Sequence, residues 1–488
     1  MRALFIYPNL SGQKYVQLGI AYLSSALKQA GHEVELFDMT WGFDRKALED
    51  VLQHYAPQWV GVSTRSTDFE YGLLAARVVK ECLDVPIAFG GAHPTVDPES
   101  VLSHDSVDMV CIGEGEGAVL ELAKRVDNRQ DYLDVEGFWF KQGDKILRNL
   151  LPPLLQDLDS LPYPDRRLFD MRHLTTYSGM IFITGRGCPY QCSYCINHHL
   201  MQLYKGKGKF VRFRSISAVL DQIELVRQQY HFESIYFGDE AFSLDRERTK
   251  SFCAAYAKRI GLPFGIMTRA DLLDDETAQI LKKAGCRSVG IGIEAGNDTI
   301  RNEVLKKREN RDTIVSAFRS ARTAGIKTYS FNMVGIPGET RETIMETVEV
   351  NRLAQADVVQ VTIFAPFKGT ALRDICEREG YLREEPVRDY YTRTFLELPT
   401  LSPAALEAYH KLFWFYCRVP RAFFPLLDAV RLVLEKMPRS WRSKVGRGLI
   451  LLENSLTWAK MTGWKETLVQ TVGKRIGLAG AGRKCEEC

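Results

Sequence analysis

The sequence predicts an α/β protein in which a doubly wound N-terminal domain precedes a partial (β/α)6 barrel and a helical C-terminal region. Two series of short apolar runs separated by amphipathic helical patterns support this fold class, one before and one after a proline-rich passage. At 488 residues the chain is long enough for about three domains. We therefore expect domains over 1–130, 178–382 and 383–488, with a linker over 131–177.

The N-terminal series contains five short apolar runs that read as strands, at 3–7, 33–37, 59–63, 86–89 and 109–112. Helical patterns separate them, so the strands should form a parallel, Rossmann-like sheet of the flavodoxin type. Ligands of such sheets bind beyond the carboxyl ends of the strands. No Gly-x-Gly-x-x-Gly follows the first strand, which argues against a dinucleotide.

The loops at these strand ends are rich in glycine, which lets backbone approach a bulky ligand closely. We expect the ligand-binding residues of this domain among them: Ser63, Thr64, Gly90, Gly91, His93, Pro94, Gly113, Glu114, Gly115 and Glu116. The passage that follows contains Leu151-Pro152-Pro153 and further prolines at 162 and 164. Proline favours extended structure over helix, so this passage reads as a connector between domains.

The second series supplies six strand candidates, at 181–184, 234–237, 263–267, 288–293, 328–334 and 358–365. Amphipathic helices lie between them, for example over 218–229, where the apolar residues share one face. Six βα units in a row predict a partial barrel. By the logic of the full barrel, functional side chains should gather at the carboxyl ends of its strands.

Three cysteines follow the first of these strands in one glycine-broken loop. Cys188, Cys192 and Cys195 have the spacing Cys-x3-Cys-x2-Cys. Thiolates bind iron–sulfur clusters, and three of them on a [4Fe–4S] cube leave one iron open for chemistry. A zinc site is the alternative, but it needs a fourth ligand at regular spacing, and His198 and His199 follow too closely.

The loop and its position resemble the radical S-adenosylmethionine (radical SAM) enzymes. The resemblance implies that the open iron is chelated by SAM. An electron from the cluster, delivered by a reductant such as flavodoxin or ferredoxin, would then cleave SAM to methionine and a 5′-deoxyadenosyl radical. It also implies that the aromatic Tyr194, just before the last cysteine, lies beside adenine.

Further strand ends resemble the SAM-binding passages of this family. Gly238-Asp239-Glu240 is similar to the passage that holds the SAM amino group. Glu294 matches the acidic residue that contacts ribose, and Gly335 and Pro337 lie in the passage that packs on adenine. Arg269 either binds the SAM carboxylate or pairs with Asp271.

The loops of the first domain look like the cobalamin-binding domain of B12-dependent radical SAM enzymes. The similarity covers 17–23, 31–34, 90–95 and 113–116. The Asp-x-His-x-x-Gly motif of B12-dependent mutases is absent, which implies a cobalt without a lower histidine ligand. For His93 we expect a structural or corrinoid-edge role. The alternative is a module of the same fold that no longer binds the cofactor.

The resemblance implies an enzyme that transfers a methyl group from methylcobalamin to an unactivated carbon of a small-molecule or lipid-like substrate. A radical cyclisation or rearrangement, as in the anaerobic magnesium-protoporphyrin ester cyclase, is the alternative. Methylthiolation would call for three more cluster cysteines in the first domain, where only Cys82 and Cys111 occur. A non-enzymatic cluster protein would have no use for the SAM passages.

Composition limits the partners and the compartment. A net charge of +3 does not suggest a nucleic-acid partner, and eleven cysteines indicate a reducing, cytoplasmic setting. The segment from residue 411 onward, however, is basic, because it contains 15 Lys and Arg but only 6 Asp and Glu. The helical pattern over 421–437 has charged residues on one stripe and a broad apolar face. We expect this face to pack on the barrel; peripheral contact with an anionic membrane is the alternative. Cys485 and Cys488 are expected in a free tail, a redox or metal role being the alternative.

Overall fold

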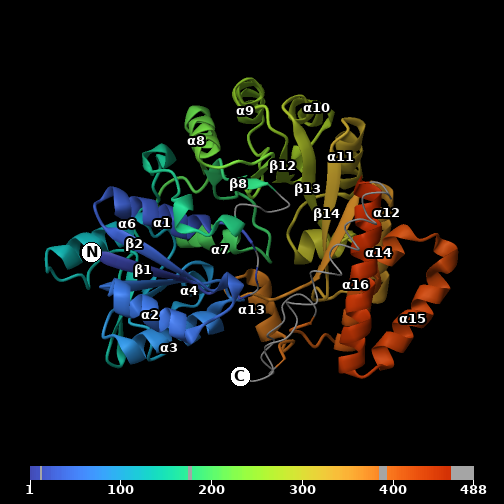
Figure 1. Cartoon of the computed structure of the whole chain (residues 1–488). Coiled ribbons are helices and arrows are strands. Elements are labelled where there is room, and N and C mark those ends of the chain that lie inside the picture. Colours follow the sequence, from blue (N-terminus) through green and yellow to red (C-terminus); the bar gives the residue numbers. More distant parts are fainter. Residues whose placement is uncertain (11, 13, 174–178, 384–392, 463–488) are drawn as a thin grey trace.

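A computed structural model describes residues 1–10, 12, 14–173, 179–383 and 393–462. Two parallel sheets dominate it, one in each of the first two domains, and a group of helices follows the second (Figure 1). Cys485 and Cys488 lie outside the described residues. The predicted fold class is confirmed, including the order of the three parts along the chain.

The N-terminal sheet has the strand order β2-β1-β3-β4-β5-β6-β7. Its first five strands are parallel and follow the flavodoxin-like order. They are the expected ones, with these bounds: β1 (Arg2–Tyr7), β2 (Glu33–Asp38), β3 (Trp59–Ser63), β4 (Ile87–Gly90) and β5 (Met109–Cys111). Except in the edge strand β2, their central positions are apolar and buried because helices cover both faces of the sheet.

The helices of this domain pack in two pairs. The first pair is α1 (Leu18–Gln29) with α6 (Glu116–Asp127), and the second is α2 (Arg45–Tyr55) with α3 (Phe69–Cys82). Short α4 (Ala92–Val96) and α5 (Pro98–Leu102) follow β4. Each pair closes a separate apolar core, so side chains that alternate along β1 enter different cores.

Part of the expected linker belongs to the first sheet. Residues 138–142 form β6 (Phe138–Gln142), which pairs antiparallel with β5, and β7 (Lys145–Arg148) pairs antiparallel with β6. Phe138 and Phe140 are buried, whereas β7 is mostly exposed, as an edge strand can be. Only the proline-rich passage after β7 has the extended character that we expected. It is interrupted by short 3-10 turns at Leu158–Ser160, Arg166–Leu168 and Met171–His173.

The second sheet is parallel throughout and has the order β15-β14-β13-β12-β11-β8. Strands that follow one another in the chain are neighbours, which is the arrangement of an open (β/α) barrel. All six expected strands are present, and they have the following bounds: β8 (Met180–Phe182), β11 (Ile235–Phe237), β12 (Phe264–Thr268), β13 (Cys286–Glu294), β14 (Lys327–Val334) and β15 (Val358–Ile363).

Helices alternate with these strands: α7 (Ile196–Leu203), α8 (Ile216–Gln229), α9 (Arg246–Arg259), α10 (Asp275–Lys283), α11 (Arg311–Thr323), α12 (Arg341–Ala354) and α13 (Ala371–Arg378). Six of the seven, α8 to α13, begin after a Ser, Asp, Asn or Thr whose side chain accepts a hydrogen bond from the first turn. Such caps satisfy donors that the helix leaves free, so the sequence itself sets where these helices start. A short antiparallel pair, β9 (Gly185–Arg186) and β10 (Arg212–Phe213), brackets the cysteine loop and α7.

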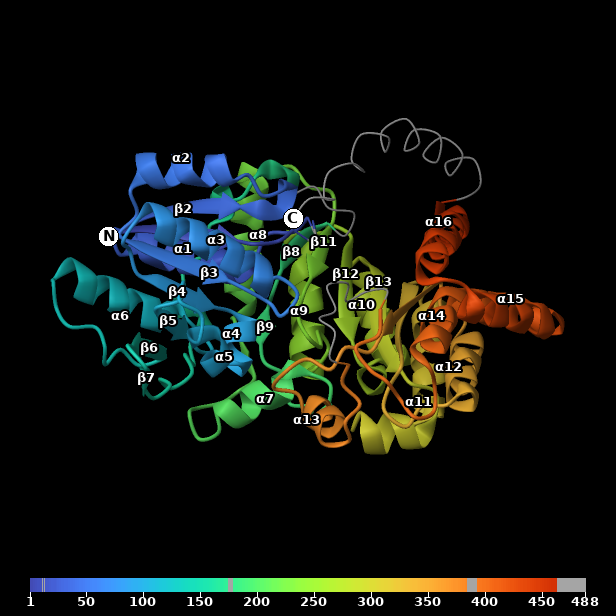
Figure 2. The same ribbon diagram turned by 90° about the horizontal axis from the view of Figure 1, so that it is seen from below.

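The C-terminal part is helical, as expected. It consists of α14 (Pro403–Arg418), α15 (Phe424–Lys436) and α16 (Arg439–Thr462), and α14 packs on β15 and α12 (Figure 2). The expectation that the apolar face of 421–437 packs on the barrel is wrong for α15. Its charged stripe faces the protein together with Phe424, Leu427 and Leu434, whereas Leu426 and Val433 on the opposite face are 61% and 54% exposed. In the part of the chain that is described, no helix is long and apolar enough to cross a membrane.

Candidate active site

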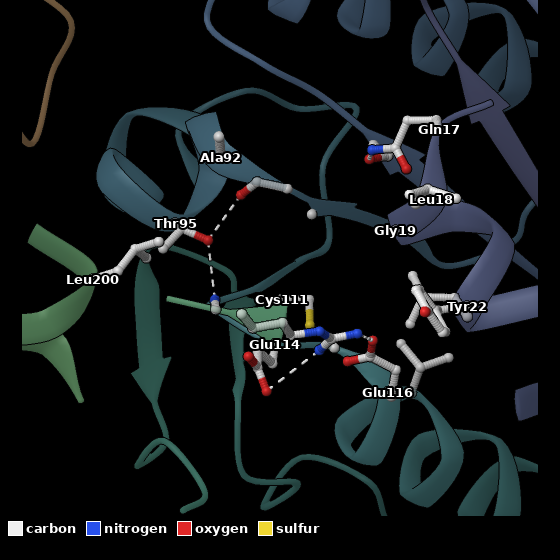
Figure 3. Close-up of a pocket in the computed structure, with 18 of the residues that line it drawn as sticks. Gln17, Leu18, Gly19, Tyr22, Ala92, Thr95, Cys111, Glu114, Glu116 and Leu200 are labelled. Carbon is white, nitrogen blue, oxygen red and sulfur yellow. Dashed lines mark hydrogen bonds and ion pairs between the residues drawn. The ribbon is translucent and has the colours of Figure 1, made fainter. Parts of the chain in front are cut away.

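A large cavity lies where the glycine-rich loops of the first domain meet the cysteine loop and α7 of the second. It has a volume of about 410 Å³. Figure 3 shows its first-domain wall, which is formed by the start of α1, the loop after β4 and the loop after β5. The opposite wall comes from the second domain and includes Arg186, Gly187, Asn197, Tyr204 and Glu240. Both domains are therefore needed to form the site.

Seven of the ten residues expected to bind cobalamin line this cavity, and they all lie at or just beyond the carboxyl end of β3, β4 or β5: Ser63, Gly90, Gly91, Gly113, Glu114, Gly115 and Glu116. Thr64, His93 and Pro94 do not line it. At Gly90 a methyl group would meet nothing nearer than Cys111 Cβ at 3.7 Å, so backbone is open to the cavity there. Hydrogen bonds from Gly113 N–H to the Thr95 hydroxyl (3.0 Å) and from that hydroxyl to Gly91 O (2.8 Å) tie the two loops together (Figure 3).

His93 is buried behind the cavity wall. Its Nδ1 lies 3.1 Å from the Ser66 hydroxyl, and its ring centroid lies 4.3 Å from that of Phe69. Its Nε2 has no hydrogen-bond partner, and burial lowers the pKa of the imidazole to about 4. This geometry fits a packing role and offers no ring nitrogen to the cavity.

Glu114 and Glu116 are engaged in ion pairs that cross between the domains. Arg186 of β9 donates to Glu116 at 2.6 Å, and Arg212 of β10 donates to both oxygens of Glu114 at 2.5 and 3.0 Å. These side chains are mostly buried, and such pairs are strong because the interior screens them little. The loop after β5 is thereby clamped to the strand that leads into the cysteine loop.

Tyr204, directly after α7, makes a second link between the domains. Its hydroxyl accepts a hydrogen bond from Glu114 N–H at 2.8 Å. Gly113 has a φ of +78°, and a methyl group on it would collide with that hydroxyl. Glycine at 113 is thus required both by the backbone and by the close approach of α7.

The three cysteines lie in the loop between β9 and α7. Cys192 is buried and Cys188 and Cys195 are half-buried, and all nine cysteines of the described residues are free thiols. In the described residues no three His, Cys, Asp or Glu side chains are grouped tightly enough for a single metal ion. The cysteine sulfurs that bind a [4Fe–4S] cube can lie farther apart, because each cysteine binds a different iron atom. The donor set therefore fits a cluster with one open iron.

Glu294 lies at the end of β13, next to the cysteine loop. It is half-buried, has a left-handed backbone (φ +65°) and accepts a hydrogen bond from the Tyr194 hydroxyl; desolvation raises the pKa of its carboxyl. Its carboxylate and the Lys307 ammonium lie together over Gly292, where a methyl group would clash with both. A non-glycine residue in a left-handed conformation is strained, and such strain is found at functional sites.

Arg269 makes the ion pair with Asp271 that was one of its two expected roles, with Nε 3.0 Å from the carboxylate. It also pairs with Glu309 at 3.2 Å and stacks 3.7 Å over the Tyr190 ring of the cysteine loop. Its Nη1 lies 4.0 Å from Cys192 Sγ. The guanidinium thus connects the strand end to the cysteine loop.

The other expected SAM-binding residues fall into two groups. Asp239, after Gly238, accepts hydrogen bonds from Thr184 N–H and its hydroxyl (both 2.9 Å), so it holds the end of β8, whereas Glu240 lines the cavity. Burial raises the pKa of Asp239 to about 6. Gly335 and Pro337 are buried in a turn after β14, where Gly335 N–H donates to Glu339 at 2.6 Å.

Sequence analysis missed several residues of the site. Lys307 and Glu309 are 4% and 3% exposed, although they belong to the run Lys306-Lys307-Arg308-Glu309, which looks like a solvated surface. The positive φ of Lys306 and Arg308 turns the alternate residues inward. Asn197, Arg186 and Tyr204 were also missed; their proximity to the cysteines was the available signal.

Comparisons with known proteins match both halves of this site. The Radical SAM superfamily profile matches residues 182–350, and the B12 binding domain profile matches residues 9–123. The chain is a cobalamin-binding radical SAM enzyme. Its family implies a [4Fe–4S] cluster, SAM and cobalamin as cofactors.

Individual relatives of this radical SAM enzyme are distant. An uncharacterized methyltransferase of Pyrococcus horikoshii is 25% identical over 77% of this chain and 81% of its own. An anaerobic magnesium-protoporphyrin IX monomethyl ester cyclase of Cereibacter sphaeroides is 28% identical over 83% and 68%. The radical SAM methyltransferase TsrM of Kitasatospora setae, solved with cobalamin and a [4Fe–4S] cluster, shares the fold with a TM-score of 0.64 at 20% identity, over 79% and 76% of the two chains.

Proposed function

We propose that this enzyme transfers a methyl group to an unactivated carbon of a small-molecule or lipid-like substrate. The observation that carries the proposal is the shared cavity, which brings the loops of the B12 domain against the cysteine loop and Glu240 of the barrel. Methyltransferases occur among the relatives, and so does the ester cyclase, so cobalamin-dependent cyclisation or rearrangement is the second candidate.

We assign the cofactors to the domains as follows. Residues 1–130 hold cobalamin through the cavity-lining loops, with β6 and β7 extending the same sheet, and residues 178–382 hold the cluster and SAM. Bound there, cobalamin would supply the methyl group, and the cluster would supply the electron that cleaves SAM. We propose Cys188, Cys192 and Cys195 as the cluster ligands.

The chain's own residues would orient these groups. Glu294, half-buried beside Tyr194, can accept hydrogen bonds from ribose hydroxyls, as acidic residues do in nucleoside sites. Lys307 and Arg269 place positive charge beside Glu294 and Cys192, where the SAM carboxylate would also need a partner. We assign Gly335 and Pro337, in the buried turn after β14, to the adenine side of SAM. The ion pairs of Arg186 and Arg212 hold the two domains together and limit water entry between them.

An electron donor such as flavodoxin or ferredoxin is needed, and a reducing compartment such as the cytoplasm suits the free thiols. The test is anaerobic reconstitution with iron, sulfide, cobalamin, SAM and dithionite. We expect 5′-deoxyadenosine, together with S-adenosylhomocysteine from the methyl donor. A cyclase would give 5′-deoxyadenosine without S-adenosylhomocysteine, and a cluster protein without activity would give neither.

The matching control replaces all three cysteines with alanine. This variant should lose the broad absorbance near 400 nm that clusters give, and all SAM cleavage. Retention of four irons per chain would contradict the ligand assignment. Electron paramagnetic resonance of the Co(II) form tests the lower ligand, since His93 lies behind the cavity wall. We expect no nitrogen coupling from a histidine.

A further inference from the structure

Helix α15 turns an apolar stripe to the outside of the molecule. Phe423, Leu426, Val430 and Val433 are 53%, 61%, 36% and 54% exposed, and their spacing of three, four and three residues places them on one helix face. Leu432, at 47%, lies beside the stripe. Figure 2 shows α15 projecting from the rest of the described structure.

The opposite face of the same helix points inward and carries both charged and apolar side chains. Asp428 accepts hydrogen bonds from the Tyr416 hydroxyl at 2.9 Å and from Arg341 at 2.7 Å. Arg431 is only 8% exposed, lies 5.1 Å over the Tyr409 ring and pairs with Glu435. The helix is therefore attached to α14 and α12 by these charged side chains together with the inward-facing Phe424, Leu427 and Leu434, which leaves the second apolar stripe without a partner in the described residues. An exposed apolar stripe of this kind marks an interaction surface.

The residues that follow the stripe in the chain include several basic residues and an exposed tryptophan. Lys436 continues the stripe at the end of α15, and Trp441, 64% exposed, follows in the first turn of α16. Lys444 and Arg447 are exposed in the next turns. Between residues 421 and 462 there are eight Lys and Arg against three Asp and Glu. Two of those three acids, Asp428 and Glu435, are held in the inward pairs.

We propose that α15, with Trp441 and the basic start of α16, docks on the surface of an anionic lipid bilayer. An apolar stripe that enters the acyl boundary, tryptophan at the interface and Lys or Arg near the headgroups are the features by which helices lie on such membranes. If the stripe bound the stripe of a second copy of the chain instead, the basic residues around both stripes would be brought together. The surface is separate from the cavity, so docking does not depend on which substrate the enzyme methylates.

The test uses the full-length protein and two vesicle preparations, pure phosphatidylcholine and phosphatidylcholine with 30 mol% phosphatidylglycerol. We expect binding to the anionic vesicles, at least tenfold weaker binding to the neutral ones, and slower amide hydrogen exchange over 424–436 when anionic vesicles are added. The variant Leu426→Glu/Val430→Glu/Val433→Glu should reduce anionic-vesicle binding at least tenfold. Because these side chains are exposed, its unfolding temperature and SAM cleavage should match the parent protein.

The matched control is Leu74→Glu/Leu150→Glu/Leu225→Glu, which adds the same charge at exposed leucines of the first two domains. It should bind anionic vesicles within twofold of the parent. Three results would overturn the proposal. They are equal loss of binding in both triple variants, a dimer in solution that the α15 variant dissociates, and amides over 424–436 that are already protected without vesicles.

Discussion

The ion pair between Arg186 and Glu116 gives the sharpest test of the site, because it separates two roles for Glu116. Arg186→Leu removes the partner of a carboxylate whose side chain is 11% exposed. Breaking a buried pair costs roughly 3–5 kcal/mol, and partial exposure favours the lower end, about 3 kcal/mol. Amide hydrogen exchange should detect this as local opening, with protection over 113–119 falling roughly a hundredfold. Iron content should be measured in parallel, since Gly187 and Cys188 follow directly.

The matched control is Arg259→Leu, which breaks an arginine pair with Asp221 and Glu224 on the exposed surface. Surface pairs contribute only about 0–1 kcal/mol, so local protection near Arg259 should change less than tenfold. A loss as large as that in Arg186→Leu would mean that removal of an arginine side chain, rather than a buried pair between domains, produces the effect.

Cobalamin affinity in a double-mutant cycle then distinguishes a clamp from a ligand. If Glu116 acts only by holding Arg186, Glu116→Gln should weaken cobalamin binding in the parent protein and have no further effect in Arg186→Leu. The affinities can be measured by the visible absorbance of hydroxocobalamin. If Glu116→Gln weakens binding tenfold in both backgrounds, Glu116 contacts the cofactor itself and the clamp is not its main role.

Three further predictions concern single positions. Glu294→Ala should weaken SAM binding tenfold to a hundredfold, since hydrogen bonds to a charged group contribute roughly 1.5–3 kcal/mol each; unchanged affinity by calorimetry would reduce Glu294 to a strand-end carboxylate. Gly90→Val fills space that is open to the cavity and should lower cobalamin affinity at least tenfold. Gly117→Val should not, because a methyl group at Gly117 meets nothing within 4 Å and this residue does not line the cavity. Burial raises the pKa of Glu339 to about 8, above its ordinary 4.5, so folding takes up a proton between these values and stability falls as pH rises. Relative to the parent, Glu339→Gln should therefore gain stability in urea between pH 5 and pH 8, and a constant difference would show that Glu339 does not titrate there.

The sequence by itself determined the fold class and the order of the domains. Short apolar runs and capped amphipathic helices are local patterns, and each barrel strand was predicted within a few residues because burial on both faces makes parallel strands apolar throughout. The cysteine spacing likewise determined the expected cluster, since all three thiols lie in one loop. Residues 138–148, which we expected in the linker, extend the first sheet; β6 alternates buried and partly buried residues, whereas β7 is an exposed edge strand without that pattern.

Only the tertiary structure decided what most charged residues do. Glu114 and Glu116 looked like ligand-binding carboxylates, yet their arginine partners are 98 and 70 residues away and no local pattern links them. Lys307 looked exposed, but the left-handed backbone on either side turns it inward. Helix α15 is another case in which the sequence alone does not decide the contacts of charged residues. Its amphipathic pattern was evident in the sequence, but which face meets the protein depended on Arg341, Tyr409 and Tyr416, which the fold brings to its charged side.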